Sequence, residues 1–160
     1  MEKIRLIKPS KEYLTQIKDY RNEFLTLNSS MDGCGPLTRT ENPEEWLEQV
    51  DLISKKETVP KEFVQATQFL CIREEDNRLV GMIQVRHYFN DYLEKFGGHI
   101  GYSVRATERR KGYAKKMLKD CLEYCKELKL EKVLVTCIES NEGSRKTILA
   151  SGGVYEKNSI

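Results

Sequence analysis

The sequence contains no apolar run long enough to cross a membrane. Such a span needs about 20 consecutive apolar residues, and no stretch of the 160 residues approaches that length. Residues 1–5 carry charges where a secretory leader would need its apolar segment, so export is not expected. The net charge is only +2, which gives no reason by itself to expect a nucleic-acid partner.

Patterns typical of metal sites are also missing. The five cysteines are odd in number and form no CxxC pair, and His87 and His99 lie far from any cysteine pair. Zinc needs about four clustered ligands, so no metal site is expected. Cys121 and Cys125 lie one helical turn apart. We interpret them as small buried hydrophobic side chains on a helix, and the alternative is a redox pair. We therefore expect a reduced, cytoplasmic protein.

The length and composition fit one globular domain over residues 1–160, with 39% hydrophobic and 32% charged residues. Ser10 and Asn42 stand where helix N-caps are expected, and Gly98 and Gly101 indicate a bulge or a close backbone approach. Periodicity predicts helices at 11–27, 43–54, 108–128 and from 141, and strands at 4–8, 68–73, 79–88, 98–104, 132–138 and from 154. This order predicts a mixed α/β sheet domain.

Positive charge is concentrated where the strand at 98–104 gives way to the long helix. Residues 105–120 hold seven basic and two acidic side chains, a local charge of +5, so the rest of the chain carries −3. The first turn of a helix has unpaired amides and a positive dipole, and Gly112 and Ala114 leave room for a phosphate to approach them. A solvated basic helix face and a nucleic-acid patch are the alternatives. Neither a Walker loop nor a GxGxxG string is present.

The string at 109–114, R-x-x-G-x-A, resembles the acyl-CoA pyrophosphate loop of the GNAT superfamily of N-acetyltransferases. The predicted element order also resembles that superfamily's fold from residue 4 to residue 155. The resemblance implies an α/β fold with a mixed, mostly antiparallel central sheet and helices on both faces. It further implies that the sheet splays between the strands before and after the long third helix. The implied activity is transfer of an acetyl group from acetyl-CoA to a primary amine, with no metal.

The resemblance also assigns roles to individual positions. The backbone at Val104, at the end of the strand 98–104, would pair with the pantetheine arm. Asn141 would hydrogen-bond that arm, with help from Ser144. The alternative role for Asn141 is a plain helix N-cap. The coenzyme-binding residues implied are Val104, Arg105, Arg109, Arg110, Lys111, Gly112, Tyr113, Ala114, Asn141 and Ser144.

The catalytic residues are less well defined. Many superfamily members place a tyrosine seven positions after the motif asparagine, as the acid for the departing thiolate, but Ile148 stands there. Tyr155 is one candidate acid, and solvent is another. Gly98 replaces a glutamate found in some relatives, which leaves His99 or a water chain as the candidate base.

The acceptor is not determined by the sequence. Residues 41–62 carry a local charge of −4, which favours a cationic small-molecule or peptide amine, although a solvated helix face explains it as well. The superfamily fold usually ends with a seventh strand, whereas this chain stops at Ile160, just into its sixth. The last strand is then absent or supplied by a second copy, which leaves a homodimer as an alternative. A non-catalytic acyl-CoA-binding module is the alternative function. No nucleic acid or membrane partner is expected.

Overall fold

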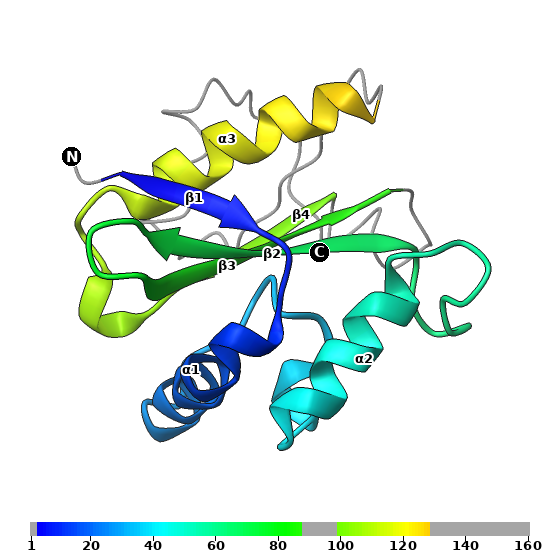
Figure 1. The fold of residues 1–160 in the computed structure, drawn as a ribbon, viewed down its shortest axis with the longest axis horizontal. Coiled ribbons are helices and arrows are strands. Elements are labelled where there is room, and N and C mark those ends of the chain that lie inside the picture. Colours follow the sequence, from blue (N-terminus) through cyan, green and yellow to red (C-terminus); the bar gives the residue numbers. More distant parts are fainter. Residues whose placement is uncertain (1–2, 88–98, 129–160) are drawn as a thin grey trace, which may run out of the picture.

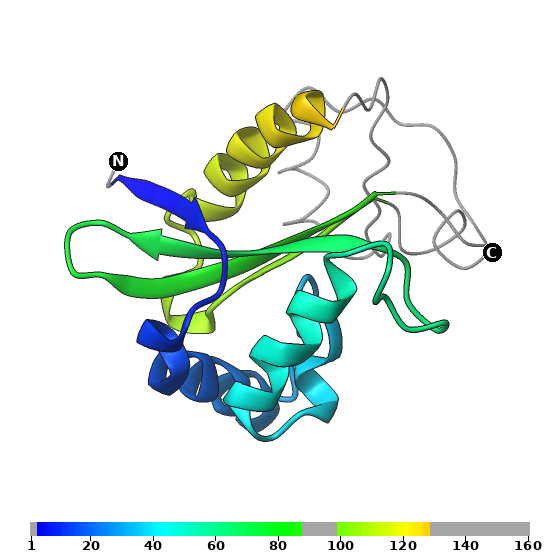
Figure 2. The same ribbon diagram turned by 45° about the vertical axis from the view of Figure 1, so that its right-hand side comes forward.

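The computed structural model describes residues 3–87 and 99–128, which form a sheet between two helical layers. The strands are β1 (Ile4–Ile7), β2 (Ala66–Arg73), β3 (Arg78–Arg86) and β4 (Ile100–Val104), all antiparallel, in the order β1-β2-β3-β4. The helices are α1 (Leu14–Thr26), α2 (Pro43–Ile53) and α3 (Tyr113–Glu127). Figure 1 shows α3 on one face of the sheet and α1 and α2 on the other, and Figure 2 confirms this arrangement from a second direction.

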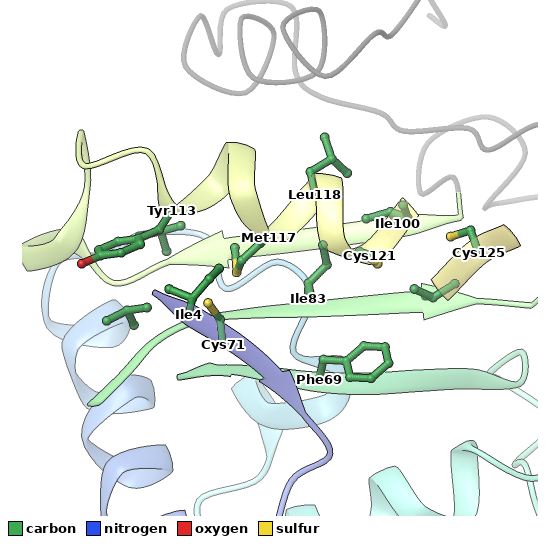
Figure 3. Packing of buried hydrophobic residues seen from close by; sticks show 13 residues of the cluster. Ile4, Phe69, Cys71, Ile83, Ile100, Tyr113, Met117, Leu118, Cys121 and Cys125 are labelled. Atoms are coloured by element: carbon green, nitrogen blue, oxygen red, sulfur yellow. The ribbon is translucent and has the colours of Figure 1, made fainter. Parts of the chain in front are cut away.

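Each face of the sheet buries its own apolar cluster. On the α3 side, Met117 and Cys121 pack towards Ile83 and Cys71 of the sheet (Figure 3). On the other side, side chains of α1 and α2, among them Trp46, cover the opposite face of the same strands. Because the middle strands are buried on both faces, β2 and β3 have nearly continuous apolar sequences without strict alternation.

The predicted helices and strands that fall within the described residues are confirmed, with corrections at helix starts. Asn42 caps α2 as expected, its Oδ1 accepting from the Glu44 amide at 2.9 Å. The Ser10 cap was wrong: its side chain makes no capping hydrogen bond, and the chain enters α1 through a 3-10 turn (Lys11–Tyr13). The start of α3 at residue 108 was also wrong. A 3-10 turn (Ala106–Glu108) and the left-handed Gly112 delay the helix to Tyr113.

The sequence predicted either a bulge or a close backbone approach at Gly98 and Gly101; of these two residues, Gly101 is described by the structure. The β3–β4 register runs without a break, and a register shift occurs instead in the pairing of β2 with β3, where Cys71 pairs with Gly81 and Ile72 with Leu79. The close approach is confirmed: a Cβ built on Gly33 would lie 2.3 Å from the Gly101 carbonyl oxygen. The connection between α1 and α2 therefore lies directly on β4.

Four described cysteines, Cys34, Cys71, Cys121 and Cys125, are free and buried, which confirms the interpretation of Cys121 and Cys125 as small core side chains. Within residues 3–87 and 99–128, no helix combines the length and apolar character that a membrane span requires. The strands predicted at 132–138 and from 154, the helix predicted from 141, and the splay of the sheet lie outside the described residues.

Candidate active site

One edge of β4 directs backbone hydrogen-bonding groups away from the rest of the described sheet. Arg105 donates its amide to the Val80 carbonyl at 2.9 Å, and the His99 carbonyl accepts from Arg86 at 2.7 Å. Both contacts join directly opposed residues in the β3–β4 register. In an antiparallel pair, residues that exchange hydrogen bonds alternate with residues whose N–H and C=O point outward. The outward groups on β4 therefore belong to Ile100, Tyr102 and Val104.

The segment after β4 has an unusual backbone that opens α3 towards this edge. Arg110 has a φ of +64° and Gly112 a φ of +86°, so two residues of one short loop are left-handed. Gly112 is the N-cap of α3, and the first helical hydrogen bond runs from the Lys116 amide to the Gly112 carbonyl at 3.2 Å. The amides of the first turn of α3 have no acceptor within the helix, which suits them to an anion. Glycine suits position 112 because it adopts this φ without strain.

The Arg109 side chain holds the loop against α1 and the end of β4. Its Nε donates to the Val104 carbonyl at 3.0 Å, and its guanidinium donates to Ser29 Oγ at 3.1 Å. The same group lies over the Phe24 ring, 5.6 Å from its centre. One arginine thus joins the outward carbonyl of β4, the C-terminal part of α1 and the connection that follows it.

Arg105 and Tyr113 direct their side chains into the protein. The Arg105 side chain is 5% exposed; its Nε donates to the Leu79 carbonyl at 2.8 Å and its guanidinium lies over the Tyr20 ring. Tyr113 is buried, and its hydroxyl accepts from Arg73 at 3.1 Å. Neither side chain faces the loop opening, so any contact of Tyr113 with a phosphate would have to come from its backbone.

Lys111 is engaged in an ion pair. Its Nζ lies 2.8 Å from Glu108 Oε1, which raises the pKa of the lysine through this hydrogen bond. Glu108 also binds Arg73 at 2.8 Å and Arg78 at 2.7 Å. Burial alone would raise the pKa of Glu108, but the hydrogen bonds from these three cations outweigh it and lower that pKa to about 2. Arg110, by contrast, is exposed.

His99 immediately precedes β4, at the end of the strand opposite the loop. Burial, followed by the nearby positive charge of Arg86, lowers the pKa of His99 below 6.5. The imidazole is therefore neutral at pH 7 and able to accept a proton. The other predicted site residues, Asn141, Ser144 and Tyr155, lie outside the described residues.

The sequence did not indicate the polar contacts that α1 and the connection after it make with Ser103 of β4. Tyr20 Oη lies 2.8 Å from Ser103 Oγ, and Cys34 Sγ lies 3.6 Å from the same oxygen. Burial raises the pKa of Cys34 to about 12, so its thiol is protonated. These contacts, and those of Arg73 and Arg78 with Glu108, join positions 30 to 83 residues apart, and no local pattern announces them.

A strand edge with outward amides beside an anion-accepting helix N-terminus is an arrangement suited to a phosphate-bearing ligand with an extended amide-containing arm. A model of the acetyltransferase (GNAT) family matches residues 32–152. The chain belongs to this family, which confirms the assignment made from residues 109–114 and, with it, the fold class and the expected enzyme class, an acyltransferase.

Solved structures agree with this assignment. The ribosomal-protein-S5-alanine acetyltransferase of Vibrio fischeri superposes with a TM-score of 0.65 at 19% identity, covering 93% of this chain and 77% of that one. The microcin C7 self-immunity acetyltransferase MccE, in complex with acetyl-CoA and AMP, gives 0.62 at 18%, covering 95% and 79%. The aminoglycoside N-acetyltransferase AAC(6')-Iy, in complex with CoA, gives 0.61 at 14%, covering 100% and 92%. At such identities the likeness establishes the fold. A search by sequence among curated proteins gave no significant match.

Proposed function

We propose that this protein transfers an acetyl group from acetyl-CoA to a primary amine. The observation that carries the proposal is the left-handed loop at Arg110 and Gly112, which opens the N-terminus of α3 beside the outward edge of β4. The family assignment and the neighbours solved with acetyl-CoA or CoA support it.

In this proposal the backbone amides of residues 110–114 receive the pyrophosphate, and the exposed Arg110 adds positive charge there; the Arg109 amide donates instead to the Ala106 carbonyl at 3.4 Å. The outward groups of Tyr102 and the outward amide of Val104 pair with the pantetheine arm in the manner of an added strand, while the Val104 carbonyl is bound by Arg109 Nε. Arg105 is no longer among the proposed ligands, because its amide donates to Val80 and its side chain is buried. Asn141 and Ser144 stay in the proposal on the family resemblance.

The chemistry then takes place towards the His99 end of β4. His99 and Val104 are five positions apart, so they lie about 16 Å apart along an extended strand. An outward amide of β4 is placed to donate to the thioester oxygen as negative charge develops on it. His99, neutral at pH 7, would take the proton that the amine releases as its nitrogen bonds to the acetyl carbon and the carbon–sulfur bond breaks. Tyr155 or solvent would protonate the thiolate.

Free thiol release tests the proposal directly. The protein is incubated with acetyl-CoA and a panel of polyamines, aminoglycosides, amino acids and peptides. Release that requires an amine supports the transferase. The control is Gly112→Val, which forces a β-branched residue into a left-handed backbone and should abolish release while the protein remains folded. If this folded control releases thiol as fast as the wild type, the loop is not the coenzyme site.

The alternative function, a non-catalytic acyl-CoA-binding module, is favoured by Ile148 at the position of the usual tyrosine. It predicts that CoA raises the melting temperature while no amine in the panel releases thiol. If acetyl-CoA neither binds nor reacts, both functions are excluded.

A further inference from the structure

Glu108 is a buried carboxylate that collects three cations at the entrance to α3. Its Oε1 accepts from Arg73 and from Lys111, each at 2.8 Å, and its Oε2 accepts from Arg78 at 2.7 Å. The Glu108 side chain is 7% exposed and that of Arg73 is 11% exposed. Charges removed from water in this way are retained only when each is well paired.

The cluster surrounds the loop on both sides. Arg73 ends β2 and Arg78 begins β3, so both come from one hairpin in the sheet. Glu108 precedes the loop, Lys111 lies inside it, and the Tyr113 hydroxyl, from the first residue of α3, binds the same Arg73 at 3.1 Å. The loop is therefore attached to the hairpin at both of its ends, through Glu108 before it and Tyr113 after it.

We propose that Glu108 is a positioning residue for the coenzyme: it holds residues 109–112 in the shape that receives the pyrophosphate before the coenzyme arrives. This inference rests on the proposed function. Glu108 itself does not touch the ligand, because its oxygens are occupied by the three cations. A loop that is already shaped loses less conformational entropy on binding, which increases affinity.

Simple electrostatics makes the opposite prediction, and this provides the test. Replacing Glu108 by glutamine removes a negative charge near the phosphate site and releases Lys111, which is half exposed, to approach the ligand. If charge alone decided affinity, Glu108→Gln would bind CoA more tightly. If the position of the loop decides it, Glu108→Gln binds CoA more weakly.

Asp76→Asn is the matched control. Asp76 binds the same Arg73 at 2.6 Å, so this variant also removes one carboxylate from the cluster. Its side chain is 46% exposed, and its hydrogen bonds within the described chain are with Arg73 of the hairpin rather than with the loop. Because Asp76 binds the hairpin residue Arg73 and does not bind the loop, Asp76→Asn should leave the loop in place.

The measurement is the dissociation constant of CoA by isothermal titration calorimetry, with thermal unfolding recorded for each protein without ligand. We expect Glu108→Gln to bind CoA about tenfold more weakly than the wild type, as loss of a charge-assisted hydrogen bond implies. Asp76→Asn should stay within about twofold. Glu108→Asp, which keeps the charge, should recover part of the affinity.

Several outcomes would overturn the proposal. Affinity in Glu108→Gln that equals or exceeds the wild-type value overturns it, as does equal weakening in Asp76→Asn. A lower melting temperature with unchanged affinity assigns Glu108 to stability alone. Should Glu108→Gln fail to fold, Arg78→Gln replaces it in 0.5 M NaCl, where distant charges are screened; unchanged affinity there also refutes the role. Absence of CoA binding by the wild type instead overturns the proposed function, which keeps the two failures distinct.

Discussion

Replacing Gly33 by alanine should destabilise the protein severely, because the connection after α1 touches the backbone of β4 at this residue. A Cβ at position 33 would lie 2.3 Å from the Gly101 carbonyl oxygen and 2.7 Å from Tyr102 Cα. These atoms belong to a strand fixed by its pairing with β3, so they cannot move aside independently. Gly33 also has a φ of +72°, and its carbonyl accepts from Gln68 Nε2 at 2.7 Å.

The magnitude follows from two costs. A side chain in the left-handed region costs about 1–2 kcal/mol, and overpacking in a close-packed region costs about 1–3 kcal/mol. We therefore expect Gly33→Ala to lower the free energy of unfolding by about 2–5 kcal/mol. Gly35→Ala is the matched control: Gly35 has a φ of +55°, but its nearest neighbour is the end of a side chain, Gln84 Nε2, at 3.2 Å. That variant should lose only the backbone cost, about 1–2 kcal/mol.

Urea unfolding of the two variants separates these costs. Trp46, the one tryptophan of the chain, is fully buried and reports unfolding by fluorescence. The excess loss in Gly33→Ala over Gly35→Ala measures the collision with β4. If both variants lose the same free energy of unfolding, the connection moves away from β4 at Gly33 without cost. This result would refute the argument that the connection is fixed on the strand.

Four further predictions concern single residues. Trp46→Phe removes the hydrogen bond from the indole to the Cys34 carbonyl, 2.8 Å, while that carbonyl keeps its hydrogen bond from the Leu37 amide at 3.2 Å; urea unfolding followed by circular dichroism should show a loss of about 0.5–1.5 kcal/mol, and a neutral result would contradict it. Arg110→Gly removes a left-handed arginine and should raise the melting temperature slightly; a decrease would mean that the Arg110 side chain stabilises the loop. Because the pKa of Glu108 is lower in the folded protein, its contribution to stability is present above pH 4.5 and is lost as the pH falls towards 2; Glu108→Gln should flatten unfolding free energy against pH in this window, and an unchanged slope would argue against the ion pairs. If His99 is the base, the acidic limb of kcat/KM has its midpoint below pH 6.5 and disappears in His99→Gln; persistence of the limb would transfer the role to another group.

Local patterns predicted the elements well where one segment decides its own structure. The Asn42 cap precedes α2, and the turn at residues 74–77 separates two β-rich runs that pair as a hairpin. The start of α3 was predicted at residue 108 although the apolar stripe begins only at Ala114, and the left-handed Gly112 delays the helix to Tyr113. Periodicity reports which residues face a core and does not report backbone φ.

The candidate site divides in a similar way. The R-x-x-G-x-A string and its place between a strand and a long helix were enough to assign the family, since the loop needs a glycine and a small residue at fixed positions whatever surrounds it. Charge counting was a weaker guide, because it treated each basic side chain alike. In the structure Arg105 is buried, Lys111 is paired with Glu108, and Arg109 binds the Val104 carbonyl.

The sequence by itself determined the order of the elements within the described residues, and the family. Only the tertiary structure decided which β4 residues turn their amides outward, because that alternation depends on the register with β3. It also decided which cations surround Glu108, since Arg73 and Arg78 reach it from 35 and 30 positions away. Neither property is encoded in a single segment; each arises when two distant segments pack against one another.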